Sequence, residues 1–300
     1  MRNLFQSAVL LGGLAAMLAY SAKWLVGLDG VLFVLAGCGL GILFAPRLSS
    51  NKIMRWYGAQ QIDHHDMLPV YDALRKISYR AGLTVAPELY YMPDGAMNSF
   101  AVGRRSDSAI AITDGMLRHL SMRELMAVLA HEVSHIAGND IWVMQIADMI
   151  TRMTRMMALI GIAVGLLSLP LAMFGGGNLP ILPILALIFA PGAAALPQLA
   201  LSRTREFEAD RSAAALTGDP IALASALKKV EAVMHPSWHR FLMPVRRGEQ
   251  PSILRSHPPT AERIGRLREM SPLGATQQRQ GIPVPVPRMR PTVIRLPFWW

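Results

Sequence analysis

Two kinds of hydrophobic pattern divide this chain. Residues 3–22, 30–46 and 156–202 contain no charged residue, whereas the segments between and after them mix apolar and polar residues at helix or strand spacing. About 20 consecutive apolar residues are enough for a helix to cross a bilayer. We therefore expect membrane-spanning helices in the charge-free stretches and a water-soluble domain built from the rest.

The stretch 156–202 is too long for one span. Its glycine-rich turn at 175–178 divides it into two spans, and Pro191 and Pro197 are expected to kink or interrupt the second, because proline lacks a backbone N–H. With the spans at 3–22 and 30–46, the chain is predicted to form two hairpins and four transmembrane helices.

Positive charge predicts the orientation of these spans. The turns of both hairpins are nearly neutral, whereas basic residues flank their outer ends. These basic residues are Arg2, Arg47, Lys52, Arg55, Arg152, Arg155, Arg203 and Arg205. Because cytoplasmic segments carry an excess of Lys and Arg, the soluble domain and both termini are expected to be cytoplasmic. We therefore expect an integral, multi-pass membrane protein, located in a bacterial inner membrane.

The spans give the domain organisation. We expect a transmembrane hairpin at 1–46, a first part of the soluble domain at 47–155, a second hairpin at 156–202, a second part at 203–270 and a Pro/Arg-rich tail at 271–300. The soluble part is predicted to be mainly α with a small antiparallel β-sheet (α+β). Helices are predicted at 66–80, 121–138, 204–216, 220–233 and 260–270, and strands at 88–92, 98–103 and 109–113.

Composition excludes several classes of protein. With 52% hydrophobic and only 17% charged residues, the chain is too apolar for a soluble domain of its length. Its one cysteine, Cys38, allows neither an intramolecular disulfide nor a cage of thiolate ligands. The net charge of +10 is attributed to orientation signals beside the spans, because no nucleic-acid-binding motif accompanies it, so no nucleic-acid partner is expected.

The motif His131-Glu132-Val133-Ser134-His135 carries the predicted chemistry. Ser121 and Glu124 form a predicted capping box, and Gly138 ends the helix, so both histidines lie one turn apart on one face. They can share one metal ion, while Glu132 can act as general base toward a zinc-bound water. The alternative is a pair of histidines on a solvated face.

A catalytic zinc needs a third protein ligand on the same side of the membrane. An even number of spans must separate it from the histidines, and the second hairpin supplies two. Glu206 and Asp210 follow that hairpin and share one helix face, whereas Glu208 points elsewhere. Residue spacing alone leaves Glu206 and Asp210 open as the ligand, with the other one orienting nearby groups.

The segment Ser202-Arg203-Thr204-Arg205-Glu206-Phe207-Glu208-Ala209-Asp210 resembles the S-R-x-x-E-[FY]-x-A-D signature of the HtpX membrane metalloproteases, which are related to the CAAX prenyl proteases. Further similarities are Asn98-Ser99-Phe100-Ala101, residues 131–140, and Ser256-His257-Pro258 with Arg263. The resemblance covers roughly residues 1–270 and implies a zincin-like protease domain that binds Zn²⁺. It implies Glu206 as the third ligand and Asp210 as a supporting residue.

A zinc endopeptidase follows as the expected function. Glu132 would assist the attack of a zinc-bound water on a peptide carbonyl, and His257 is the candidate donor to the oxyanion. Residues Asn98, Ser99, Phe100 and Ala101 are candidates for pairing with an extended substrate, if they form an edge strand. Because Glu206 follows the last span closely, the expected substrates are cytoplasmic segments of damaged or misfolded membrane proteins.

Two alternatives remain at this point. A prenyl-protein endoprotease of the CAAX type would need more spans and a large enclosed chamber. A non-enzymatic membrane scaffold with a structural metal would need a fourth protein ligand, commonly cysteine. The sequence predicts no oligomeric state.

Overall fold

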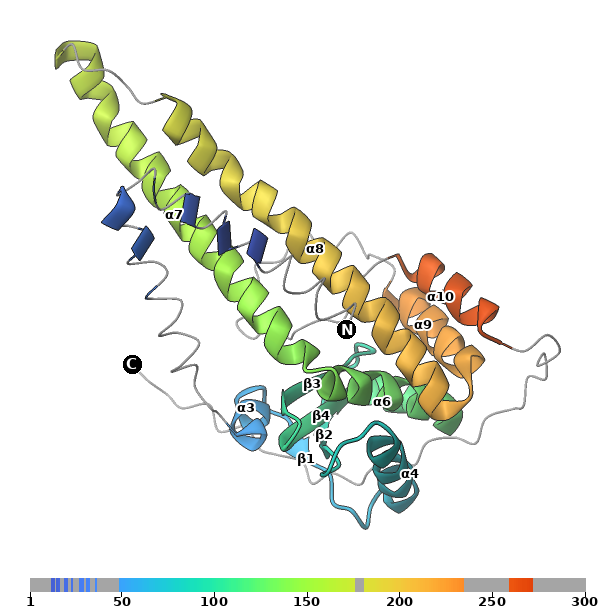
Figure 1. The fold of residues 1–300 in the computed structure, drawn as a ribbon. Coiled ribbons are helices and arrows are strands. Elements are labelled where there is room, and N and C mark those ends of the chain that lie inside the picture. The colour runs from blue at the N-terminus through green and yellow to red at the C-terminus, as the bar shows by residue number, and fades with distance from the viewer. Residues whose placement is uncertain are drawn as a thin grey trace.

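A computed structural model of the chain describes residues 49–175, 181–234 and 259–271, with isolated positions between 12 and 36 (Figure 1). Its elements in chain order are α3 (Ser50–Trp56), β1 (Gln60–Gln61), α4 (Leu68–Arg80), β2 (Glu88–Met92), β3 (Ser99–Arg104), β4 (Asp107–Thr113), α5 (Asp114–His119), α6 (Met122–Ala137), α7 (Asp140–Gly175), α8 (Ile181–Thr217), α9 (Pro220–Met234) and α10 (Thr260–Glu269). The three predicted strands and the helices at 66–80, 121–138, 220–233 and 260–270 are confirmed to within two residues. Elements α3, β1 and α5 were not predicted.

The sheet is mixed, so the prediction of an antiparallel sheet was wrong. Its strand order is β1-β2-β4-β3, in which β1 and β3 pair antiparallel to their neighbours while β2 and β4 run parallel. The reason is topological: β3 and β4 form a hairpin, and β4 rather than β3 lies beside β2. Strand β3 is therefore at the edge of the sheet, as the candidate substrate strand requires.

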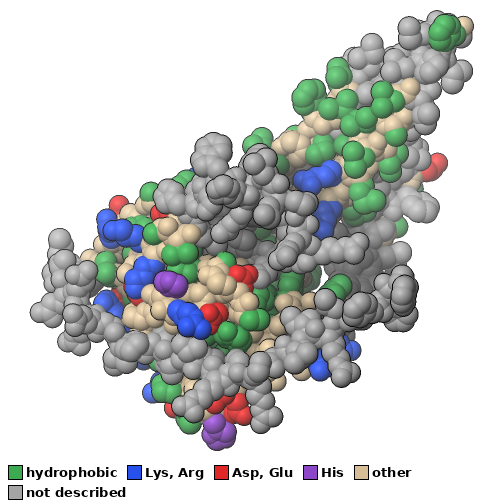
Figure 2. Space-filling view, turned by 180° about the vertical axis from the view of Figure 1, so that it is seen from behind, with side chains coloured by type: hydrophobic (Ala, Val, Ile, Leu, Met, Phe, Trp, Pro, Cys, Tyr) green, Lys and Arg blue, Asp and Glu red, His purple; other side chains and the backbone are tan. Residues whose placement is uncertain are grey.

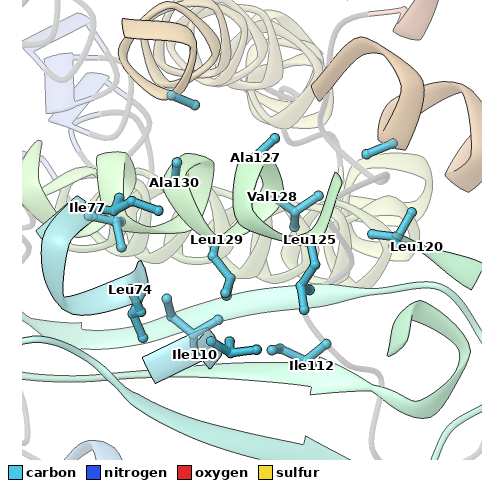
Figure 3. Packing of buried hydrophobic residues seen from close by; sticks show 14 of the residues in the cluster. Leu74, Ile77, Ile110, Ile112, Leu120, Leu125, Ala127, Val128, Leu129 and Ala130 are labelled. Atoms are coloured by element: carbon cyan, nitrogen blue, oxygen red, sulfur yellow. The ribbon is translucent and has the colours of Figure 1, made fainter. Parts of the chain in front are cut away.

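Both faces of β4 are covered, which explains why its central residues, 109–112, are all apolar rather than alternating with polar ones. On one face, Leu125 and Leu129 of α6 point toward Ile110 and Ile112, and α4 adds Leu74 to the same cluster (Figure 3). On the other face, side chains from α3, β2 and β3 form a second cluster: Met54, Ala59, Tyr90, Met92, Phe100, Val102, Ala109 and Ala111. The sheet thus gives α6 a rigid support.

The predicted ends of α6 are confirmed in detail. Ser121 Oγ accepts from the backbone N–H of Glu124, while the Glu124 carboxylate accepts from the backbone N–H of Ser121 at 2.8 Å. At the other end, Gly138 is the C-cap in right-handed helical conformation, and the next residue, Asn139, takes the left-handed conformation with φ 55°. Asn is one of the few residues that tolerate this conformation. The turn leads directly into α7.

Helices α7 and α8 form a long antiparallel arm that projects from the rest of the molecule (Figure 1). Helix α8 continues through Pro191 and Pro197, so the predicted interruption is absent, and the helix predicted at 204–216 is its last part. Helix α8 packs against α7. Hydrophobic side chains gather over the surface of the arm (Figure 2).

Among the residues that the structure describes, no helix combines the length and the apolar content needed to cross a membrane.

Several predicted features lie outside the described residues. These are most of the hairpin at 1–46, residues 176–178 of the predicted turn, His257 and the tail beyond 271.

Candidate metal centre and active site

Helix α6 positions the two histidines of the motif at one point. His131 and His135 lie one helical turn apart, and their Nε2 atoms approach to 3.2 Å. The two rings are perpendicular, with an interplanar angle of 90°. Their arrangement follows from the i, i+4 spacing, because α6 is regular over its whole length.

Helix α8 brings the carboxylate of Glu206 to the same point. Its Oε2 lies 3.5 Å from His131 Nε2, and its Oε1 lies 3.4 Å from His135 Nε2. Tetrahedral zinc with bonds of about 2.0–2.1 Å to N and O ligands places its ligand atoms about 3.3 Å apart. The three side chains predicted as ligands therefore meet at the spacing that a tetrahedral ion requires.

Each imidazole has a carboxylate on its far side. His131 Nδ1 lies 3.1 Å from Asp210 Oδ1, and His135 Nδ1 lies 2.9 Å from Asp140 Oδ2. A carboxylate beside Nδ1 favours the tautomer with its proton there, which leaves the Nε2 lone pair for a metal. Two such lone pairs and a carboxylate facing one another would repel, unless a cation lies between them. The donor set thus fits a metal.

Asp210, which the family resemblance implies as a supporting residue, lies beside His131. Asp140 was missed, although it stands only five residues beyond His135 in the sequence. The signal that could have found it is an acidic residue directly after the helix end at Gly138, within reach of the last turn of α6.

The buried charges around the histidines favour a divalent ion. Four carboxylates and two guanidinium groups, each at most 6% exposed, surround the cluster: Glu132, Asp140, Glu206, Asp210, Arg205 and Arg263. With all six ionised, two negative charges are left over among these residues. Because an unbalanced buried charge is strongly destabilising, an ion of charge +2 suits the site.

The pKa values of the histidines reflect the same negative environment. Burial alone would lower the pKa of His131, but the carboxylates of Asp210 and Glu206 outweigh it and raise the pKa above the ordinary value. Burial opposes the shift of His135 too, yet Asp140 and Glu206 raise its pKa further. The site therefore attracts positive charge, either a proton or a metal ion.

Arg263 of α10 ties the carboxylates of α8 together. Its guanidinium donates two hydrogen bonds to Asp210, at 2.7 and 2.6 Å, and its Nη1 lies 3.2 Å from Glu206 Oε2. Burial raises the pKa of the Asp210 carboxyl, but the hydrogen bonds from Arg263 and His131 outweigh it, so the net pKa is lowered. Helix α10 is held on α8 by Arg266, whose guanidinium lies 3.7 Å from the ring centroid of Phe207. Arg263 thereby keeps Asp210 ionised beside His131.

The Glu132 carboxylate lies beside the start of β3. Its Oε1 accepts a hydrogen bond of 2.9 Å from Ser99 Oγ, and its side chain is buried. Contact between α6 and the edge strand therefore fixes the carboxylate orientation. The predicted base and one predicted substrate-binding residue lie side by side.

Three of the four candidate substrate-binding residues lie in β3, and Asn98 directly precedes the strand. Ser99 faces Glu132, whereas Phe100 faces the opposite cluster, where its ring packs at 5.3 Å against Tyr57. Ala101 packs beside the main core. Asn98 is buried, and its Oδ1 atom has no hydrogen-bond partner among the described residues. Within the described chain, no strand pairs with the outer edge of β3.

A cavity of about 30 Å³ adjoins His131 and Glu132. Apolar side chains form most of its wall: Met97, Met116, Val128, Leu223, Ala226, Leu227 and Val230. Its polar rim consists of Asn98, Ser99 and Arg263, together with His131 and Glu132. Helix α9 supplies one side of this cavity, which sequence reasoning did not foresee.

Comparisons with known proteins agree with this site. A family model described as "Peptidase family M48" matches residues 70–271. A protein named "Protease HtpX homolog" from Methylibium petroleiphilum is 35% identical over 293 residues, which cover 91% of this chain and 99% of that protein. The protein of the same name from Paraburkholderia phytofirmans is 36% identical over 295 residues, with the same coverage of 91% and 99%.

Among solved structures, the crystal structure of S. mikatae Ste24p is similar at a TM-score of 0.44 and 19% identity, covering 89% of this chain and 64% of that one. The match to the family model is the more informative result, because it extends from α4 to the end of α10 and includes every described residue of the site. The chain therefore belongs to peptidase family M48 and is a metalloprotease.

Proposed function

We propose that this protein is a membrane-attached zinc endopeptidase that cleaves cytoplasmic segments of damaged or misfolded membrane proteins. The observation that carries the proposal is the convergence of His131, His135 and Glu206 at tetrahedral spacing, with Glu132 adjacent. His and carboxylate ligands without cysteine are typical of catalytic rather than structural zinc sites. Three protein ligands also leave one position for substrate.

The side chains of the site have separable roles. Zinc, when bound by His131, His135 and Glu206, would supply Lewis-acid polarisation and lower the pKa of water. Glu132 takes the proton from the attacking water and delivers it to the leaving amine nitrogen, as a general base and then a general acid. Ser99 holds Glu132 for this task through its 2.9 Å hydrogen bond.

Substrate binding is proposed along β3. An extended peptide beside the outer edge of this strand would hydrogen-bond to backbone groups that no strand of the described chain pairs with. Oδ1 of Asn98, which has no hydrogen-bond partner among the described residues, supports this, because a buried amide oxygen that gains a backbone N–H partner from substrate is stabilised. His257 remains our candidate for donating to the oxyanion.

The arm is proposed as the membrane attachment. Residues 156–202 carry no charge, and the arm exposes large apolar side chains, among them Leu159, Leu166, Phe189 and Leu196, each more than 60% exposed. Exposed apolar patches of this kind mark contact with a membrane or a partner. Glu206 follows residue 202 within about 6 Å along a helix, so the site would lie close to the membrane surface. Membrane proteins are then the natural substrates.

The test is metal analysis and proteolysis of unfolded casein by the detergent-purified chain. Wild-type protein should contain about one zinc per chain and cleave casein, and a chelator should abolish the cleavage. Glu132→Gln should keep the zinc and lower kcat at least about 100-fold, because it removes the base and leaves the ligands.

Glu231→Gln is the matched control, because Glu231 is exposed on α9 away from the site. It should retain both zinc and activity. Normal cleavage by Glu132→Gln would show that Glu132 is not the base, and a zinc-free active protein would refute the proposal.

A further inference from the structure

The cavity lined by His131 and Glu132 directly adjoins the candidate metal centre. His131 and Glu132 form part of its wall, so its contents are within contact distance of the reacting groups. Most polar groups of the lining are engaged, since Ser99 donates to Glu132 and Arg263 donates to Asp210, whereas Oδ1 of Asn98 has no hydrogen-bond partner among the described residues. A side chain entering the cavity would therefore find few hydrogen-bonding groups there.

The residues that α9 contributes to the wall are all apolar. Helix α9 presents Leu223, Ala226 and Val230, all buried, and Leu227, which is partly exposed at the rim. An ionised or amide side chain placed there would lose its hydration without compensation. The wall thus selects aliphatic over polar side chains.

Size adds a second restriction. The cavity measures about 30 Å³, whereas a single water molecule needs about 10–15 Å³ on the same measure. A few carbon atoms fit, and an aromatic ring does not. Met97 and Met116 in the wall have flexible side chains that can adjust to the shape of the bound group.

We infer that this cavity is the specificity pocket of the protease and that it selects a short aliphatic side chain, from alanine to leucine, at one position flanking the scissile bond. The inference rests on the proposed function and adds a substrate class to it. Cleavage within apolar segments that are normally buried suits an enzyme acting on unfolded proteins, because such side chains become accessible only on unfolding.

The first experiment maps cleavage sites in unfolded casein by mass spectrometry. One of the two positions flanking the cut should be enriched in Ala, Val and Leu and depleted in aromatic and charged residues. A matched peptide pair with Val or Phe at that position should differ in kcat/KM by about tenfold or more in favour of Val. Inactive Glu132→Gln should show the same order in peptide binding, measured by fluorescence anisotropy.

Substitutions in α9 then locate the preference in this pocket. Ala226→Leu narrows the pocket. It should reduce the cleavage of peptides with Leu at the selected position by about tenfold or more, whereas peptides with Ala at that position should be cleaved as before. Ala232→Leu, on the exposed side of the same helix, should leave the profile unchanged. Leu227→Arg adds a cation at the rim and should make acidic side chains acceptable.

Zinc content and melting temperature are measured for each variant. If Ala226→Leu fails to fold, Leu227→Arg still tests the pocket, because Leu227 is partly exposed and can be replaced without disrupting the core. If no residue type is enriched at either position flanking the cleaved bond, the cavity is not the specificity pocket, and the proposed function still stands. Absence of any cleavage by the zinc-loaded wild type would overturn the proposed function and the pocket with it.

Discussion

Asp140 Oδ2 lies 2.9 Å from Nδ1 of His135, although Asp140 begins α7 and His135 belongs to the last turn of α6. The other oxygen of Asp140 accepts a hydrogen bond of 2.6 Å from Arg205, one residue before Glu206 on α8. A single buried carboxylate therefore connects one histidine of the candidate metal site to both helices of the arm. The orientation of His135 and the position of α8 depend on the same group.

Asp140→Asn should weaken zinc binding about 10–100-fold, because the neutral amide no longer favours the metal-binding tautomer of His135. Zinc affinity is measured by competition with a chromogenic chelator. Asp72→Asn, exposed on α4, serves as the control and should bind zinc normally. Wild-type affinity in Asp140→Asn would mean that Asp140 does not position His135.

Arg263→Met should destabilise the protein by about 3–5 kcal/mol, because it leaves the buried carboxylates of Asp210 and Glu206 without their guanidinium partner. Thermal unfolding in detergent measures the loss. Arg268→Met, exposed on the same helix, should change the melting temperature little. Equal melting temperatures for both variants would contradict the proposed role of Arg263.

The lowered pKa of the Glu124 carboxyl predicts a loss of stability in acid. Burial raises the pKa of its carboxyl, but hydrogen bonds from Lys229, Ser121 and Ser225 outweigh it, so the folded-state pKa lies below the ordinary 4.5. A lowered folded-state pKa gives stability that is complete above the unfolded-state value and is lost as the pH falls through the folded-state value. Unfolding free energy should therefore decline with falling pH below about 4.5.

Glu124→Gln should be less stable at neutral pH and should lose less stability on acidification than the wild type. Urea titrations at several pH values measure both effects. Glu269→Gln, on an exposed position of α10, should follow the wild-type pH dependence. Parallel curves for wild type and Glu124→Gln would show that this carboxylate is not responsible.

The proposed membrane orientation places the tip of the arm on the side opposite to the protease domain. In a Cys38→Ala background, Phe174→Cys should react with a membrane-impermeant maleimide added to the outside of intact cells, because Phe174 is 89% exposed at the end of α7. Tyr79→Cys, 83% exposed on α4, should react only after the cells are opened. Labelling of both cysteines from the same side would contradict the orientation.

The local features of this protein were determined by its sequence. The helix with His131, Glu132 and His135 was predictable, because its capping residues and 3.6-residue period are read within one segment. Spacing alone also placed Glu206 and Asp210 on one helix face. The three main strands were predictable from runs of apolar and β-branched residues between turns.

Only the tertiary structure decided which segments meet. Strand β2 pairs in parallel with β4, because the hairpin of β3 and β4 places β4 rather than β3 beside β2. The alternation of apolar and polar residues within a strand does not encode which neighbour the strand pairs with. Asp140 supports His135, and Arg263 joins Asp210 to Glu206, through contacts between separate helices. The apolar pocket needs α9 to face α6. Hydrophobic and helical periods are local properties, whereas a site is made by contacts distant in sequence, whose partners depend on how whole elements pack.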